Sequence, residues 1–223
     1  MLFVYSFVFG LIFQPKWAET DSIGMQSYPI FIFSGLSIFN IFAECVNGSA
    51  PLIIQHTSYV KKVVFPLELL PLNLVLASFI FGSVWILLLL LGIFFVAGQF
   101  YLSVILLIVP LISLFFFSLG LSYFFSSICV FLRDTQYFLA ILVQILSFVT
   151  PIFFPLAVVP EKFRWILLCN PLAHIVEYVR NVCLYNIVPD WDYSLILIFS
   201  SLAFFYFGLL WFMATKKGFA DVL

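Results

Sequence analysis

Charged side chains are scarce in this sequence: Asp, Glu, Lys and Arg make up 9% of its 223 residues. Soluble domains carry roughly 25% charged residues, so the composition excludes a soluble globular protein. The formal net charge is −1, whereas nucleic-acid-binding proteins favour a basic surface, so no nucleic-acid partner is expected. Hydrophobic residues make up 65% of the chain and its mean hydropathy is +1.24, which predicts a protein built for the lipid bilayer.

The motifs of common enzyme and cofactor sites are also absent. The sequence has no Gly-x-x-x-x-Gly-Lys-[Ser/Thr] phosphate loop, no Gly-x-Ser-x-Gly and no His-Glu-x-x-His. His56 and His174 are predicted on opposite sides of the membrane, and no Cys-x-x-Cys pair exists for zinc or redox chemistry. Cys169 and Cys183 either pair on an aqueous face or are two small buried side chains. We therefore expect no ATPase site, metal or cofactor on this chain.

Six apolar runs dominate the pattern of the chain. A membrane helix needs about 20 mostly apolar residues, and the runs cover residues 1–13, 29–49, 68–95, 102–128, 136–156 and 193–214. We predict an all-α polytopic membrane protein with six transmembrane helices in a single domain over residues 1–223. The first run ends near Phe13, too short to span alone, so that helix is either completed by residues upstream or enters the membrane only partly.

Basic residues in the predicted loops orient these helices. Lys and Arg are enriched in cytoplasmic loops, above all in short ones. We place both chain ends in the cytoplasm, which puts five basic residues there, namely Lys61, Lys62, Arg133, Lys216 and Lys217. Four basic residues then lie outside, namely Lys16, Lys162, Arg164 and Arg180.

Residues 50–66 form a polar cytoplasmic loop with a basic pair, Lys61-Lys62. We predict a short amphipathic helix there. It either docks a cytoplasmic subunit or anchors the chain to anionic lipid headgroups, and both roles are compatible.

The outer loop, residues 155–192, follows an unusual helix. An apolar run begins after Arg133-Asp134 and breaks at Thr150-Pro-Ile-Phe-Phe-Pro155. Because proline ends or kinks a helix, we predict that this helix crosses the bilayer and that the chain then folds back along the outer face in re-entrant helices. Such an arrangement is typical of a gate. Glu177 and Arg180, one helical turn apart in this loop, are expected to pair there.

Polar side chains recur on one face of two predicted membrane helices. The second helix carries Ser37, Asn40, Glu44 and Asn47, and the fifth carries Gln136, Gln144, Ser147 and Thr150. Polar groups in a membrane usually face protein or water. The two faces therefore form either a hydrated seam or hydrogen-bond contacts between helices. Glu44 faces that seam or lies at the cytoplasmic headgroup level.

Four of these segments occur in an order and spacing that resemble a known family. They are Lys61-Lys-Val-Val-Phe-Pro-Leu-Glu-Leu-Leu-Pro71, Arg133-Asp134, Thr150-Pro-Ile-Phe-Phe-Pro155 with Val159-Pro-Glu-Lys-Phe-Arg-Trp165, and Asn170-Pro-Leu with Glu177-Tyr-Val-Arg180. Together they resemble the membrane subunits of type-2 ABC exporters, particularly those that export O-antigen, capsular or teichoic-acid polysaccharides. The resemblance extends over nearly the whole chain.

The resemblance implies a permease subunit in the bacterial plasma (inner) membrane. Two copies of the chain would work with two separate ATP-binding cassette subunits, which use ATP and Mg²⁺. A lipid-linked polysaccharide would pass between the two copies. Members of this family usually begin with an amphipathic cytoplasmic helix, which does not precede the first apolar run here, and we hypothesise that the true start lies upstream or that the product is truncated.

The resemblance also implies roles for particular residues. Coupling to the ATPase is implied for the loop 50–66 and its surroundings, with Tyr59, Lys61, Lys62, Phe65, Pro66, Arg133 and Asp134. The substrate path is implied for Tyr5, Asn40, Glu44, Gln144 and Ser147. The outer gate is implied for Pro151, Pro155, Trp165, Asn170, Pro171, Glu177 and Arg180.

Two other functions stay open at this point. A type-2 ABC exporter of drugs or other small substrates is the alternative within transport, although such proteins more often fuse an ATPase or carry a large outer domain. A membrane-bound glycosyl- or acyl-transferase would need the acidic and histidine side chains of the outer loop to converge, namely Glu161, His174, Glu177, Asp190 and Asp192.

Overall fold

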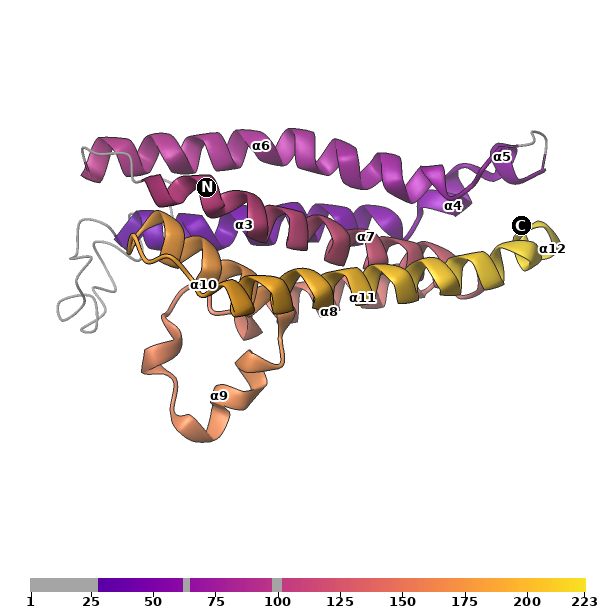
Figure 1. Ribbon diagram of the computed structural model, residues 1–223. Helices are drawn as coiled ribbons and strands as arrows, with labels where there is room; N and C mark the ends of the chain where they lie inside the picture. Colours follow the sequence, from indigo (N-terminus) through magenta and orange to yellow (C-terminus); the bar gives the residue numbers. More distant parts are fainter. Residues whose placement is uncertain (1–27, 62–64, 98–101) are drawn as a thin grey trace.

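A computed structural model describes residues 28–61, 65–97 and 102–223, and this part of the chain contains helices and turns but no strand (Figure 1). Its long helices are α3 (Tyr28–Ser49), α6 (Leu69–Ala97), α7 (Ile108–Phe131), α8 (Thr135–Val149) and α11 (Trp191–Thr215). Its short elements are α4 (Leu52–Gln55), α5 (Thr57–Lys61), η3 (Leu102–Leu107), η4 (Leu156–Val158), α9 (Glu161–Leu168), α10 (Pro171–Cys183), η5 (Lys216–Gly218) and α12 (Phe219–Val222). The predicted all-α class is confirmed for the described residues.

Four described helices are long and apolar enough to cross a membrane. They cover Tyr28–Ser49, Leu69–Phe95, Ser103–Phe131 and Trp191–Val222. These spans match the second, third, fourth and sixth predicted runs, whereas the first run lies outside the described residues. The fifth run corresponds to α8, whose 15 residues extend about 22 Å at about 1.5 Å per residue. That length is shorter than a hydrocarbon core of about 30 Å, so the count of six spans stays a prediction.

α8 ends where the sequence places Thr150 before Pro151. The ring of a proline disfavours a helical conformation at the preceding residue, and Thr150 is extended, with φ −82° and ψ 134°. Its backbone N–H still donates to the Leu146 carbonyl at 2.8 Å and closes the last turn. The chain then leaves the axis of α8 and continues into α9 and α10.

α7 and α11 pack along most of their length because two glycines meet where they cross. A Cβ atom on Gly208 would overlap the Gly120 carbonyl, and one on Gly120 would lie 2.7 Å from the Phe205 Cα. Small residues allow such close approach of helix backbones in a membrane. Beside this crossing, the rings of Phe117 and Phe204 pack edge-on with centroids 5.1 Å apart.

The outside of the bundle carries large apolar side chains, as a surface in contact with lipid would. Phe95 on α6 is 80% exposed and Phe207 on α11 is 72% exposed. α3 is enclosed instead, with Phe31, Ile38 and Cys45 buried.

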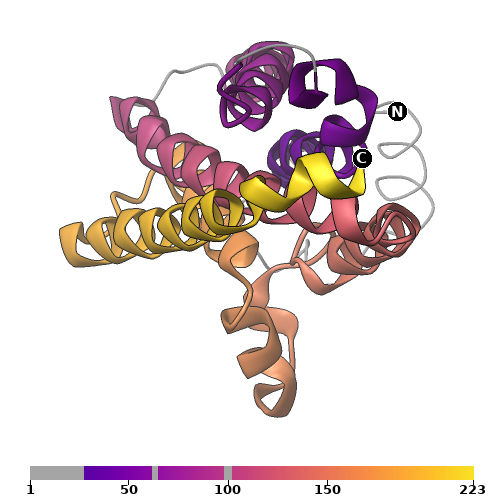
Figure 2. The ribbon, with the colours of Figure 1, turned by 90° about the vertical axis from the view of Figure 1, so that its right-hand side faces the viewer.

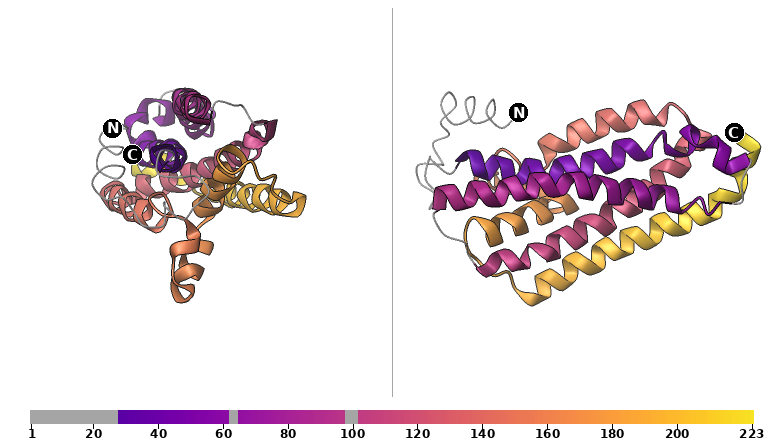
Figure 3. Two further views of the ribbon diagram at one scale, coloured as in Figure 1. Left: turned by 90° about the vertical axis from the view of Figure 1, so that its left-hand side faces the viewer. Right: turned by 90° about the horizontal axis from the view of Figure 1, so that it is seen from above.

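The bundle has two distinct ends. The α5 end carries α4, α5 and α12, and the opposite α10 end carries α10 together with the starts of α3 and α11 (Figure 1). α9 projects sideways from the bundle near the α10 end (Figures 1 and 2). Seen from above, α8 and α11 flank the bundle on opposite sides, with α3 next to α8 (Figure 3).

Candidate functional site

Asn170 joins the start of α10 to the break after α8. Its Oδ1 accepts a hydrogen bond from the Leu172 N–H at 3.0 Å and so caps α10, while Pro171 occupies the first turn. Its Nδ2 donates to Thr150 Oγ1 at 3.0 Å. The Thr150 hydroxyl in turn donates to the Leu146 carbonyl at 2.8 Å. One amide side chain therefore connects two helix termini that are 20 residues apart in the chain.

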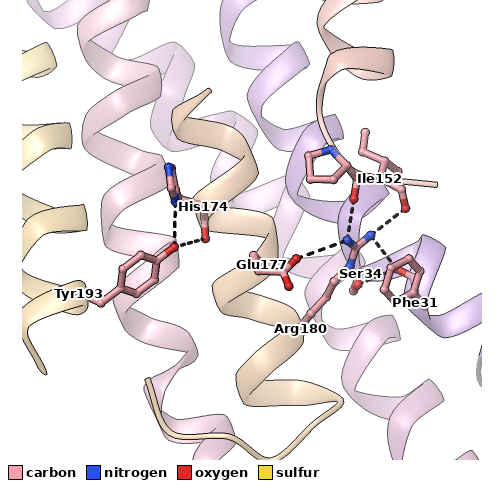
Figure 4. A network of polar contacts seen from close by, with 8 residues as sticks. Phe31, Ser34, Ile152, His174, Glu177, Arg180 and Tyr193 are labelled. Carbon is pink, nitrogen blue, oxygen red and sulfur yellow. Dashed lines mark hydrogen bonds and ion pairs between the residues drawn. The ribbon is translucent and has the colours of Figure 1, made fainter. Parts of the chain in front are cut away.

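Arg180 makes the second connection, and its side chain is fully buried. Its Nη1 donates to the Pro151 carbonyl at 2.6 Å and its Nη2 to the Ile152 carbonyl at 2.7 Å (Figure 4). A buried charge is costly unless its donors are paired. Backbone carbonyls just past a helix C-terminus suit a cation, because the helix dipole gives that end a partial negative charge. Arg180 therefore stabilises the broken end of α8 from α10.

The same guanidinium also contacts α3. Its Cζ lies 3.6 Å from the centroid of the Phe31 ring, and Nη2 lies 3.5 Å from the Phe31 carbonyl. A guanidinium over an aromatic face is favourable, more so when water is excluded. We name the meeting point of α3, α10 and the α8 break, made by Phe31, Thr150–Ile152, Asn170 and Arg180, the Arg180 junction.

Gly35 makes room for this junction. A Cβ atom there would lie 3.1 Å from Arg180 Nη2 and 3.2 Å from the Ile152 Cα. Sequence reasoning missed both Gly35 and Phe31. In the sequence, Gly35 is one glycine inside an apolar run and Phe31 is one of 31 phenylalanines. Neither pattern predicts a contact with a residue more than a hundred positions away.

Glu177 lies at the edge of the junction. Its Oε2 is 3.9 Å from Arg180 Nη1, and its side chain is 28% exposed. The two residues are in contact, as the sequence spacing predicts. The carbonyls of Pro151 and Ile152 lie more than 1 Å nearer to the guanidinium, because they approach it at 2.6 and 2.7 Å. The backbone of the α8 break is therefore the principal partner of Arg180.

α10 is also fastened to the start of α11. His174 Nδ1 lies 3.0 Å from the Tyr193 hydroxyl (Figure 4), and the Tyr178 hydroxyl lies 2.8 Å from Ser194 Oγ. The rings of Tyr178 and Tyr193 stack with centroids 6.1 Å apart. α10 is thus held between α3, the α8 break and α11.

The seven residues proposed for the outer gate fall into two groups. Pro151, Asn170, Pro171, Glu177 and Arg180 lie at or beside the Arg180 junction. Pro155 is buried in the connection that follows, and Trp165 is 63% exposed on the projecting helix α9. The structure therefore does not bring Trp165 to the junction.

The polar side chains proposed for the substrate path lie on the exposed faces of neighbouring helices. On α3, Asn40 and Glu44 are exposed although most of this helix is enclosed. On α8, Gln144 is exposed and Ser147 is half-buried, donating to the Gln144 carbonyl at 2.7 Å. Tyr5 lies outside the described residues.

The residues predicted to couple the chain to an ATPase lie at the α5 end, as far as the structure describes them. Tyr59 stacks on His56 with centroids 5.8 Å apart, contacts the Phe65 ring at 4.9 Å, and is 40% exposed. Pro66 is exposed, and Arg133 and Asp134 are exposed in the turn between α7 and α8. Lys61 is the last residue of α5, whereas Lys62 lies outside the described residues.

The pairing of Glu68 with Lys216 was also missed by sequence reasoning. Lys216 Nζ lies 2.6 Å from Glu68 Oε2, and this hydrogen bond lowers the pKa of Glu68 below its usual value. The partners are 148 residues apart, so no local pattern could reveal the pair.

The described residues contain no group of three metal-ligating side chains. All four cysteines are free; Cys169 is exposed and Cys183 is buried. His174 bonds to Tyr193 and to the Leu168 carbonyl, in contacts that hold helices together.

Comparison with known proteins places the chain in a family. A sequence model described as ABC-2 type transporter matches residues 1–184. The chain is 28% identical over 222 residues to the O-antigen export system permease protein RfbA of Klebsiella pneumoniae, covering 99% of this chain and 82% of that protein. It is 29% identical over 167 residues to the polysialic acid transport protein KpsM of Escherichia coli, covering 74% of this chain and 64% of that protein. This chain therefore belongs to the ABC-2 type transporter family.

Proposed function

We propose that this chain is the membrane subunit of an ATP-driven exporter of a lipid-linked polysaccharide in a bacterial inner membrane. The observation that carries the proposal is the similarity to an O-antigen export permease over 99% of the chain. A similarity of that extent includes both ends of the bundle, so it covers the predicted coupling loop 50–66 as well as the outer helices. O-antigen, capsule and teichoic acid are the substrate classes that we consider.

The energy for export would come from partner subunits. The sequence has no phosphate loop of its own. We propose that two copies of the chain assemble with two ATP-binding cassette subunits, which bind ATP and Mg²⁺. Tyr59, exposed on the short helix α5, supports docking at the α5 end because it offers an aromatic anchor, as protein interfaces often do.

The α10 end would then face the outside, with both chain ends in the cytoplasm. We propose six membrane helices, in which residues 1–13 contribute to the first and α8 to the fifth, and α9 and α10 as the re-entrant helices of the outer gate. The burial of α10 among α3, α7 and α11 supports this role, since a loop in water would not need such an apolar face. The Arg180 junction links the gate to α8.

The polar faces of α3 and α8 would line the path of the polymer between the two copies. Asn40, Glu44 and Gln144 are exposed in the single chain, although exposed polar groups in lipid are costly. A second copy opposite these faces, with a hydrated path between the copies, removes that cost. Tyr5 would join this path from the first helix.

Deletion of the gene tests the proposal directly. We expect polysaccharide to disappear from the cell surface and lipid-linked polymer to accumulate inside, as measured by fractionation and gel analysis. A plasmid copy of the gene should restore export. The same plasmid should not restore export in cells whose ATP-binding subunit carries an inactivated phosphate loop. Unchanged surface polymer together with greater sensitivity to small toxic compounds would contradict the proposal and favour a drug exporter.

A further inference from the structure

Residues 216–223 fold onto the α5 end as η5 and α12 (Figures 1 and 2). α12 has four residues, Phe219–Val222. Helix nucleation is unfavourable, so a helix this short has no stability of its own in water. Contacts with the rest of the protein must hold the segment in place.

Phe219 provides the apolar contact. Its side chain is 0% exposed. Its ring centroid lies 5.5 Å from that of Phe212 on α11 and 5.9 Å from that of Phe131 at the end of α7. The same apolar cluster contains Leu52, Ile53, Val60, Phe65 and Leu67. These residues belong to the segment 52–68, which we call the coupling segment; it takes in most of the predicted coupling loop 50–66 and extends it to Glu68. Phe219 thus packs in one cluster with the coupling segment and the ends of α7 and α11.

Lys216 provides the polar contact. Its Nζ lies 2.6 Å from Glu68 Oε2, with the two side chains 30% and 31% exposed. Glu68 is held from a second side, because the Tyr123 hydroxyl on α7 donates to its backbone carbonyl at 2.9 Å. Thr215, next to Lys216, lies 2.6 Å from Ser127 Oγ on α7, hydroxyl to hydroxyl. The end of the coupling segment, α7 and the end of α11 are therefore fastened together within a few residues.

We propose that residues 216–223 are a positioning element for the coupling segment 52–68, with Lys216 and Phe219 as its principal residues. α5 packs against α4 and α12, so without this element α5 would be tied to the bundle chiefly through α4 when a partner subunit presses on it. With it, a displacement of α5 also displaces the ends of α7 and α11. This inference rests on the proposed function. The ABC-2 type transporter model matches residues 1–184, so the match does not extend to residues 216–223.

α11 connects residues 216–223 to the α10 end of the bundle. Its first turn carries Tyr193 and Ser194, which contact His174 and Tyr178 on α10. α10 in turn holds the α8 break through Arg180. A continuous set of packed residues therefore leads from the coupling segment to the Arg180 junction.

Charge reversal tests the positioning role in the full complex of permease and ATP-binding subunits, reconstituted in lipid vesicles. Lys216→Glu and Glu68→Lys should each lower permease-dependent ATP hydrolysis and polymer export per ATP by about fivefold, at the low end for coupling between sites. The double variant should restore both quantities. Lys217→Glu, at the exposed neighbouring lysine, is the matched control and should behave as wild type.

Co-purification of the ATP-binding subunits with every variant shows that assembly is intact. Phe219→Ala should reduce the same two quantities, and Phe219→Leu should largely preserve them, because leucine still fills the apolar site. Single charge variants that hydrolyse ATP and export polymer like wild type would overturn the inference. So would a double variant that fails to recover.

Failure of the proposed function gives a different result. A wild-type complex that hydrolyses ATP but exports no polysaccharide would contradict the substrate assignment. The positioning role would then be decided by the loss and recovery of permease-dependent ATP hydrolysis in the same charge series.

Discussion

At the scale of single residues, the main structural feature is a buried guanidinium whose partners are backbone carbonyls. Arg180 is fully buried and donates to the carbonyls of Pro151 and Ile152, two residues just past the end of α8. Lysine carries the same charge but presents it at one point, whereas arginine has a planar fork of donors. The site therefore needs the shape of the guanidinium as much as its charge. Its ion pair with Glu177, at 3.9 Å, adds less.

Arg180→Lys should destabilise the protein by about 1–3 kcal/mol, since at least one buried carbonyl loses its donor. The measurement is thermal unfolding of the purified protein in detergent, followed by intrinsic tryptophan fluorescence. Arg164→Lys on α9 is the matched control, because Arg164 makes a single long contact of 3.5 Å to the Val159 carbonyl. Equal unfolding temperatures for Arg180→Lys and wild type would contradict the assigned role.

At the scale of secondary-structure elements, close backbone contact arranges the bundle. Helices in lipid gain little from apolar burial against one another, so packing and close approach decide which pairs form. α7 and α11 meet through Gly120 and Gly208. At Gly35, α3 comes close to the Arg180 side chain and to the backbone of Ile152.

Gly120→Ala should destabilise the protein by about 1–3 kcal/mol, because its methyl group overpacks the crossing of α7 and α11. Gly92→Ala is the matched control on α6, where an added Cβ atom meets nothing within 4 Å. Unfolding temperatures in detergent compare the two. Similar effects of both substitutions would mean that the crossing is not tightly packed and would contradict this account.

At the scale of the whole molecule, two chemically different ends are separated by the apolar bundle. The α5 end offers short helices, an exposed tyrosine and the charged turn at Arg133 and Asp134. The α10 end offers a buried helix held by Arg180 and Asn170. This polarity is what a transporter needs if energy enters on one side and the substrate leaves on the other.

Reversing charge at the α5 end should therefore disturb coupling but not insertion. Lys61→Glu combined with Lys62→Glu should lower permease-dependent ATP hydrolysis by about tenfold or more, if each lysine contributes on the order of 1 kcal/mol to docking. Lys162→Glu on α9, at the other end, is the control. Unchanged hydrolysis in the double variant, with normal amounts of protein in the membrane, would argue against docking at this end.

The helices and the break after α8 could be predicted from the sequence, because each depends on interactions within a short stretch of chain. Four apolar runs became four helices long enough to span a membrane, since each satisfies its backbone hydrogen bonds internally. The break at Thr150-Pro151 lies where the motif places it, because a proline acts on the residue just before it. The contact between Glu177 and Arg180 likewise follows from helical spacing.

What only the tertiary structure decided are the pairings between distant segments. Arg180 was expected to pair with Glu177, one turn away, but its nearer partners are carbonyls 28 and 29 residues earlier in the chain. Lys216 and Glu68 meet across 148 residues. The sequence by itself determined membrane helices, their breaks and the family, because composition and periodicity are properties of each segment. Which side chain fills which gap depends on how the helices pack, and that is set by the whole bundle.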